Sequence, residues 1–276
     1  MIDIKKGKLF VVGLPIGNLE DISLRVKNTL DMVDIIASED TRNAIKILSY
    51  LELDTQLISY HDHSDKNQLN KLINYLKNGK NIALISDSGT PLICDPGYRL
   101  VRTAIDNEIL ITVIPGSCAL ITALAGSGLP TDRFIFEGFF SKKMLDRKDL
   151  FFEKRTIIFY ESVHRVKKSI IDMIKIFGPD RQVVISRELT KLHEGIYRGS
   201  LIELSNEFEI GNITKKGEFV ILVSGNSKEL SSDDSEIIRV YNILNSNLPS
   251  NDSLNLTSKI TGSSRNYIYK LVKIIN

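Results

Sequence analysis

The sequence has 276 residues, of which 42% are hydrophobic and 25% are charged, with 36 basic and 34 acidic side chains. This length fits one large or two ordinary domains, and the apolar fraction can fill their cores, so the composition excludes a wholly disordered chain. A formal net charge of +2 excludes a histone-like or polyacidic protein. Because two cysteines make no disulfide framework, and we find no signal peptide and no apolar run of roughly 18 residues, we expect a cytoplasmic protein without a membrane span.

The first 115 residues alternate short apolar runs with amphipathic stretches. We predict strands at residues 8–12, 34–38, 81–86 and 109–114. We predict helices at residues 21–32, 66–78 and 98–106, with Asp21 as the N-cap of the first. Strands that alternate with helices favour a parallel sheet that is covered on both faces.

Segments rich in Gly, Pro and Asp follow three of these predicted strands. They are residues 13–18 (GLPIGN), 86–97 (SDSGTPLICDPG) and 115–117 (PGS). The carboxyl ends of parallel strands meet at one edge of a sheet, so together the three segments predict a small-molecule site there. Each segment alone is equally well explained as a tight turn, and the first lacks the third glycine of a dinucleotide-binding fingerprint.

The character of the chain changes near Phe134, where strands become more frequent relative to helices. We predict strands at residues 156–160, 182–186, 199–204 and 218–223, and a helix at 165–177. This ratio favours an α/β domain with antiparallel or mixed pairing. Two polar segments, 159–165 (FYESVHR) and 187–194 (RELTKLHE), follow strands. Their cations suit phosphate groups and their carboxylates or His193 suit proton transfer, although solvated loops often look the same.

The C-terminal part divides into a linker and a basic segment. Residues 226–235 (NSKELSSDDS) have the composition of a linker, and residues 254–276 contain four Lys or Arg and no acidic residue. Two short helices around residues 261–266 resemble a helix-turn-helix, which either binds nucleic acid or forms a solvated tail or a dimer contact. We therefore predict domains at 1–118 and 119–226, followed by a linker and helical segment at 227–276.

Neither a metal site nor a catalytic cysteine is favoured. His61 and His63 have no adjacent third ligand and no paired cysteines, so we expect no metal. Cys94 and Cys118 lie in turn-rich segments without an evident base partner.

Taken together and in this order, the motifs carry a resemblance to a known family. They are residues 12–19 (VGLPIGNL), 39–42 (EDTR), 86–97, 115–117, 159–165 and 187–194. Over roughly residues 7–225 the chain resembles the ribosomal small-subunit RNA methyltransferase I family, within the tetrapyrrole-methylase superfamily. It departs from the usual family pattern at Leu14, Cys118 and Val163, where Thr, Ala and Pro are usual.

The resemblance implies a fold and an activity. The fold would be two α/β domains with S-adenosylmethionine in the cleft between them, usually as a homodimer. The enzyme would methylate the 2′-hydroxyl of a decoding-region cytidine in 16S ribosomal RNA, and we expect the 30S subunit to be its substrate. This chemistry requires no metal.

The resemblance also implies roles for individual residues. Residues expected to contact the cofactor are Pro15, Ile16, Thr90, Pro91, Ile93, Ser117, Cys118, Tyr160, Gly217, Glu218 and Phe219. For the proton of the ribose hydroxyl we expect Glu161 to be the first candidate base, with Asp40 and Lys191 behind it. For the RNA phosphates we expect contacts from Arg42, Arg165, Arg187 and Lys191.

Three other functions stay open at this point. A tetrapyrrole C-methyltransferase would share the fold and cofactor, but it has no use for a basic tail. A nucleic-acid-binding regulator would rely on residues 254–276 and leave most of the chain unexplained. A nucleotide-binding protein without catalysis would bind the cofactor and transfer no methyl group.

Overall fold

The computed structural model describes residues 6–61, 66–226 and 232–275. The chain divides into two compact units. The first consists of Met1–Gly126 with Arg187–Gly195, and the second of Ser127–Ser186 with Ile196–Asn276.

A parallel sheet forms the centre of the first unit, as predicted. Its strands are β1 (Lys8–Val12), β2 (Ile35–Ser38), β3 (Leu57–Ser59), β4 (Ile82–Ile85) and β5 (Leu110–Ile114), in the order β3-β2-β4-β1-β5. All of the pairings are parallel. Strands β2 and β4 are buried along their whole length and are almost entirely apolar, because helices cover both faces of the sheet.

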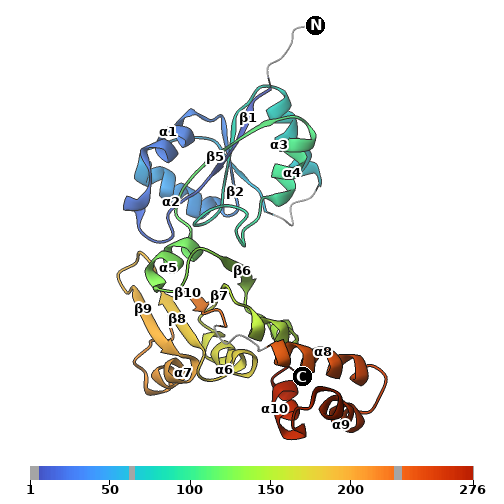
Figure 1. Cartoon of the computed structure of the whole chain (residues 1–276). Helices are drawn as coiled ribbons and strands as arrows, with labels where there is room; N and C mark the ends of the chain where they lie inside the picture. The colour runs from blue at the N-terminus through green and yellow to red at the C-terminus, as the bar shows by residue number, and fades with distance from the viewer. Residues whose placement is uncertain (1–5, 62–65, 227–231, 276) are drawn as a thin grey trace. The chain divides into compact units, whose positions relative to one another are not determined.

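Two pairs of helices cover the two faces of this sheet (Figure 1). On one face α1 (Leu24–Met32) and α2 (Thr41–Leu51) pack against side chains such as Phe10 and Val12. On the other face α3 (Lys66–Lys77) and α4 (Tyr98–Asp106) pack against side chains such as Leu9 and Leu84. Helix α5 (Ala119–Ser127) follows β5.

The first helices begin at different residues from those predicted. Residues Leu19–Asp21 form a 3-10 turn, and Ser23, not Asp21, is the N-cap of α1, because its hydroxyl accepts from the backbone N–H of Val26. Helix α2 was not predicted. It begins after Asp40, whose carboxylate accepts from the backbone N–H of Arg42.

The second unit contains a mixed sheet, which confirms the predicted class of pairing. Its strands are β6 (Phe134–Phe139), β7 (Thr156–Glu161), β8 (Gln182–Arg187), β9 (Gly195–Ser200) and β10 (Phe219–Val223), in the order β6-β7-β10-β8-β9. Strand β10 is antiparallel to β7, whereas β6 is parallel to it. Two 3-10 segments, Lys142–Asp146 and Lys148–Phe152, precede β7. Helices α6 (Val166–Phe177) and α7 (Leu201–Ile210) pack on the core of this sheet.

The strand predicted at residues 199–204 is wrong. Strand β9 ends at Ser200, which caps α7: its hydroxyl accepts from the backbone N–H of Glu203, and the Glu203 carboxylate accepts from the backbone N–H of Ser200. This reciprocal pair satisfies two backbone donors and starts a helix where apolar residues alone indicated a strand.

The C-terminal residues form three helices with a core of their own. Helices α8 (Ser232–Asn245), α9 (Ser250–Thr261) and α10 (Arg265–Ile275) bury Ile237, Tyr241, Leu254, Ile268 and Val272. Helix α9 ends at Gly262 in the left-handed region, which gives the predicted turn. Helix α8 starts within the predicted linker. Since α8 brings three carboxylates, the three helices carry five cations and four carboxylates, and together they are nearly neutral.

None of the helices in the described ranges combines the length and the apolar character that crossing a bilayer requires.

The capping pair at α7 gives a stability prediction. We expect Ser200→Ala to lower the free energy of unfolding by about 1 kcal/mol and Tm by about 2–4 °C, because backbone N–H groups at the helix start lose their acceptor. Chemical and thermal unfolding measure this. Ser205→Ala, inside the same helix, is the matched control and should be neutral or slightly stabilising. Equal effects of the two substitutions would contradict the capping role.

Candidate functional site

The segments that follow β4, β1 and β5 are joined by hydrogen bonds at the carboxyl edge of the first sheet. The backbone N–H of Leu14 donates to the carbonyl of Gly89 (2.8 Å), and the N–H of Gly89 donates to the carbonyl of Pro15 (3.2 Å). The Thr90 hydroxyl donates to the carbonyl of Ser117 (3.0 Å). We call these three joined segments, residues 13–18, 86–97 and 115–118, the rim. The structure thus brings together the three segments that the sequence singled out.

Two glycines allow the rim to close. A Cβ on Gly116 would lie 2.4 Å from the carbonyl oxygen of Gly13, and a Cβ on Gly13 would lie 2.7 Å from the backbone nitrogen of Gly116. Both atoms belong to backbone, so no side-chain movement can relieve the clash. The two chain segments can therefore approach this closely only with glycine at both positions.

Residues 187–195 belong to the first unit although both ends continue into strands of the second sheet. In this segment the Lys191 side chain packs on Gly17, where an added Cβ would lie 2.5 Å from Lys191 Cγ. The Lys191 ammonium pairs with Glu188 at 2.9 Å. The guanidinium of Arg187, which is 8% exposed, donates to the carbonyl of His193 (2.9 Å). Arg187 thus fixes the segment from inside, and Lys191 places a cation beside the rim.

Four residues of the rim and of segment 187–195 have left-handed backbone conformations that L-residues rarely adopt. They are Leu92 (φ 74°), Cys94 (φ 62°), Glu188 (φ 50°) and Thr190 (φ 67°). Such conformations cost on the order of 1–3 kcal/mol each and gather at functional sites. The buried Thr190 hydroxyl has no hydrogen-bond partner among the described residues. A strained segment with an unused buried hydroxyl is what a bound polar ligand would complete.

Asp40 and Arg42 form an exposed ion pair at the start of α2. The Arg42 guanidinium donates to the Asp40 carboxylate at 2.6 Å, and this hydrogen bond lowers the pKa of Asp40 to about 2. Asp40 is therefore ionised at neutral pH, and the pair weakens only as the pH falls from 3.8, its ordinary value, towards 2. A carboxyl group with so low a pKa is a poor proton acceptor. Arg42 is 86% exposed, as an RNA contact requires.

In the second unit, Glu161 is 2% exposed at the end of β7. One carboxylate oxygen accepts from the Ser162 backbone N–H (2.8 Å), and the other accepts from the Ser169 hydroxyl in a short hydrogen bond. Both donors are neutral, and no cation of the described chain forms an ion pair with this carboxylate. A buried carboxylate without a cation partner is a candidate for function as well as for structure.

The other expected residues of the second unit lie around the same strands. Tyr160 meets the edges of two aromatic rings, at centroid distances of 4.8 and 5.8 Å. Phe219 points into the core, so only its backbone is available to a ligand. Gly217 and Glu218 precede β10. The Arg165 guanidinium donates to the carbonyl of Phe140 (2.6 Å).

The sequence missed the polar partners of the rim. The Asp87 carboxylate accepts from the backbone N–H of Asp40 (3.2 Å) and from the Asn43 side chain (3.1 Å). This ties α2 to the loop after β4. Asn43 belongs to no sequence motif. A prediction of helix α2 directly after β2 would have placed Asn43 in the first turn of that helix. Of the remaining expected residues, Pro15, Ile16 and Pro91 lie in the rim, Cys118 is partly exposed, and Ile93 is exposed.

Comparisons with known proteins agree with this architecture. Residues 8–205 match the family model of tetrapyrrole (corrin/porphyrin) methylases. Proteins named ribosomal RNA small subunit methyltransferase I are similar along nearly the whole chain. The relative from Escherichia coli O157:H7 is 40% identical over 97% of this chain and 95% of its own length, and that from Pseudomonas aeruginosa is 42% identical over 96% of each.

The chain belongs to this methyltransferase I family of the tetrapyrrole methylases. Solved structures confirm the fold of the superfamily. A uroporphyrin-III C-methyl transferase from Thermus thermophilus, complexed with S-adenyl homocysteine, has a TM-score of 0.55 at 15% identity over 80% of this chain and 98% of that one. Diphthine synthase has a TM-score of 0.58 at 13% identity over 78% and 89%. The family resemblance and fold class predicted from the motifs are thus confirmed.

Among the residues that the structure describes, no group of three or more His, Cys, Asp or Glu side chains could hold a metal ion. His63, the second histidine of the pair at positions 61 and 63, lies outside the described residues.

The glycine contact gives a prediction for the rim. We expect Gly116→Ala to lower the free energy of unfolding by about 1–3 kcal/mol, because the new Cβ meets backbone and forces the segments apart. Urea unfolding measures this. The control is Gly199→Ala, whose Cβ would first meet the Glu203 carboxylate at 3.1 Å and should cost less, because a side-chain atom can shift by the few tenths of an ångström required whereas backbone cannot. A Gly116 variant as stable as the control would disprove the need for this contact.

Proposed function

We propose that the protein transfers the methyl group of S-adenosylmethionine to the 2′-hydroxyl of a cytidine in the decoding region of 16S ribosomal RNA. The observation that carries the proposal is the 40% identity, along nearly the full length, to proteins named ribosomal RNA small subunit methyltransferase I. We propose the 30S subunit as the substrate and the cytoplasm, where ribosomes are, as the location. The homodimer that the family resemblance implies stays a prediction.

The rim fits the cofactor in its chemistry. S-adenosylmethionine supplies an activated methyl group on a sulfonium sulfur, with a polar amino-acid part and a ribose. Pro15, Ile16, Thr90, Pro91 and Ser117 would hold it by backbone groups and hydroxyls, since the glycines of the rim let a ligand approach the main chain. The unpartnered Thr190 hydroxyl adds an unused donor close to Gly17.

The chain's own contribution is to orient the RNA hydroxyl and to take its proton. The hydroxyl must lie about 3–3.5 Å from the methyl carbon and in line with the breaking bond, since holding the reacting atoms in this geometry lowers the barrier. Among the residues expected to meet RNA, Arg42 is exposed, whereas Arg165 and Arg187 donate to backbone carbonyls. We therefore propose Arg42 and Lys191 for direct phosphate contact and the other two arginines for holding their loops.

Glu161 stays the first candidate for the proton acceptor. Its charge is met by two neutral donors, whereas Asp40 is held ionised by Arg42 and Lys191 pairs with Glu188. Because the hydrogen bond to Arg42 lowers the pKa of Asp40 to about 2, Asp40 is a poor proton acceptor, and Glu161 remains the carboxylate to test.

The substrate is tested with methyl-labelled S-adenosylmethionine and three acceptors: 30S subunits that lack the modification, naked 16S RNA, and uroporphyrinogen. We expect label in the 30S RNA that resists alkali and maps to a 2′-O-methylcytidine. Label in uroporphyrinogen alone would refute the proposal. Cofactor binding without transfer to any acceptor would do so as well and would favour a non-catalytic binding protein.

The role of Glu161 is tested with two variants. If Glu161 accepts the proton, Glu161→Gln should lower kcat by roughly 10²–10⁴-fold and leave cofactor affinity unchanged. Ser169→Ala removes one hydrogen bond to the same carboxylate and should change kcat by less than about tenfold. Single-turnover methylation and Tm are measured for both. A Glu161→Gln variant with nearly normal kcat and a lowered Tm would make Glu161 a structural brace of the 161–165 turn.

A further inference from the structure

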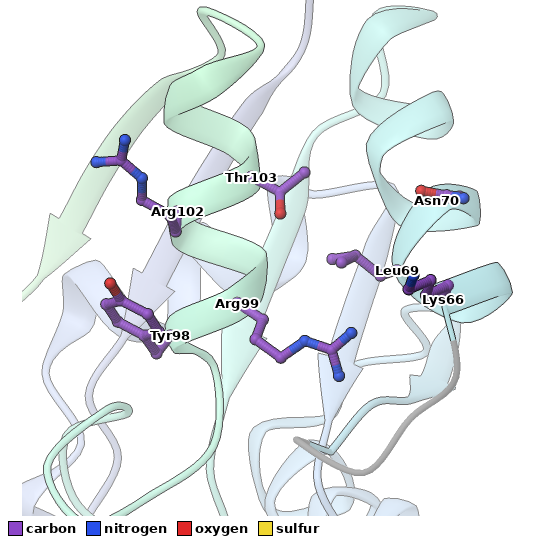
Figure 2. Close-up of a pocket in the computed structure, with 7 residues that line it drawn as sticks. All are labelled: Lys66, Leu69, Asn70, Tyr98, Arg99, Arg102 and Thr103. Atoms are coloured by element: carbon purple, nitrogen blue, oxygen red, sulfur yellow. The ribbon is translucent and has the colours of Figure 1, made fainter.

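The first unit has an open hollow of about 350 Å³ between α3 and α4 (Figure 2). It is distinct from the rim residues expected to hold the cofactor. Most of its lining residues have polar or basic side chains, although apolar atoms, such as those of Leu69 and of the long side-chain stems, make up most of the lining surface. The polar and basic ones include Lys66, Asn70, Tyr98, Arg99 and Arg102.

Positive charge is concentrated on these two helices. Together α3 and α4 carry three Lys and two Arg against a single carboxylate, Asp106, whereas the whole chain carries 36 cations and 34 carboxylates. Helix α7, by contrast, carries three Glu and no cation. The chain as a whole is nearly neutral, but these two helices form a local basic surface. Such a surface attracts polyanions, whereas the same small net charge spread evenly over the molecule would not.

The side chains divide into two groups around α4. Figure 2 shows Arg99 extending from α4 towards the α3 side, where Lys66 and Leu69 lie. Arg102 and Tyr98 occupy the other flank of α4, and Arg102 pairs with Asp106 at 3.0 Å. Lys66, Arg99 and Arg102 are the three cations that line the hollow, and Tyr98, which is 67% exposed, adds an aromatic surface to it.

The hollow lies at the same edge of the sheet as the rim. Lys66 and Tyr98 are the first residues of α3 and α4, and helices in a parallel α/β sheet begin near the carboxyl ends of the strands. Tyr98 directly follows segment 86–97, which carries Thr90 of the rim. If one unit of an extended polyanion lies at the rim, the next units along the polymer would lie close to the hollow.

We propose that this hollow binds the sugar-phosphate backbone of the substrate RNA next to the methylated nucleotide, with Lys66 and Arg99 on phosphates and Tyr98 against a base or ribose. The inference rests on the proposed function and adds a second contact surface to it. Arg presents a planar fork that matches phosphate oxygens, and exposed aromatic rings stack on unpaired bases. The hollow is open, which suits a polymer chain that continues beyond it on both sides. A site for a single phosphate ion would need hydrogen-bond donors on more sides of the ion.

The test uses the double variant Lys66→Gln/Arg99→Gln in the full-length protein. We expect KM for 30S subunits to rise roughly tenfold, with kcat at saturating subunits and KM for S-adenosylmethionine unchanged. The magnitude of the slope of log affinity against log salt concentration should fall by about 1–2, because each phosphate contact that is lost means that fewer counterions are released when the RNA binds. The control is Lys71→Gln/Lys77→Gln, which removes two charges from the same helix outside the hollow and should change KM by less than about twofold.

A second variant tests the hollow without removing a cation. Asn70→Glu places a negative charge among the lining residues, at an exposed helical position where glutamate is well tolerated. It should raise KM for 30S subunits by a similar factor. Equal KM values and salt slopes for all variants and the wild type would overturn the inference. So would equal losses in the test and control pairs, which would reflect net charge only. If the wild-type protein methylates no RNA, it is the proposed function that fails, so the two failures are distinguishable.

Discussion

The candidate site depends on one contact, the close approach of backbone to backbone at Gly13 and Gly116. Strand β1 lies between β4 and β5, so the segments that leave these strands must share a small space at one edge of the sheet. Without side chains at the two glycines, main-chain groups can meet there and hydrogen bond to each other. The result is a surface built largely from backbone, whose geometry is fixed by the sheet and is insensitive to side-chain rotamers.

Residues with strained backbone conformations lie around this surface. The left-handed residues Leu92, Cys94, Glu188 and Thr190 lie in two segments that the sheet and its hydrogen bonds hold in place. A conformation that costs free energy persists only where the surroundings enforce it. The Arg187 guanidinium, bonded to the carbonyl of His193, is one such enforcement, and it explains why this arginine is buried in a segment whose sequence looks like a solvated loop.

The sequence predicted those parts of the molecule that local patterns determine. Apolar runs bounded by Gly and Pro located β1, β4 and β5, and the amphipathic pattern located α3 and α4, because burial of one face sets the spacing. Local patterns failed at α7, where the Ser200 cap starts a helix in a stretch of apolar residues. The prediction also omitted α2, although its buried residues Ala44, Ile47, Leu48 and Leu51 recur at helical spacing. Local patterns also could not show that Lys191 packs on Gly17, since this contact joins residues distant in sequence, or that Glu161 at a strand end faces Ser169 in the next helix, since this contact depends on how the turn between them folds.

The assignment of residues 187–195 to the first unit has a consequence for how the chain folds. The ribosome releases residues 1–126 first, but the segment that completes this unit emerges only after β6, β7, α6 and β8 have been made. The first unit therefore cannot be completed before strands β6, β7 and β8 of the second sheet have been synthesised, and contacts such as that of Gly17 with Lys191 close a loop of more than one hundred residues. Loops of this length form late because closing them costs chain entropy. The surface around Gly17 should accordingly be among the last parts of the molecule to become ordered, so that a nascent chain interrupted before residue 187 would have the first sheet but an incomplete site.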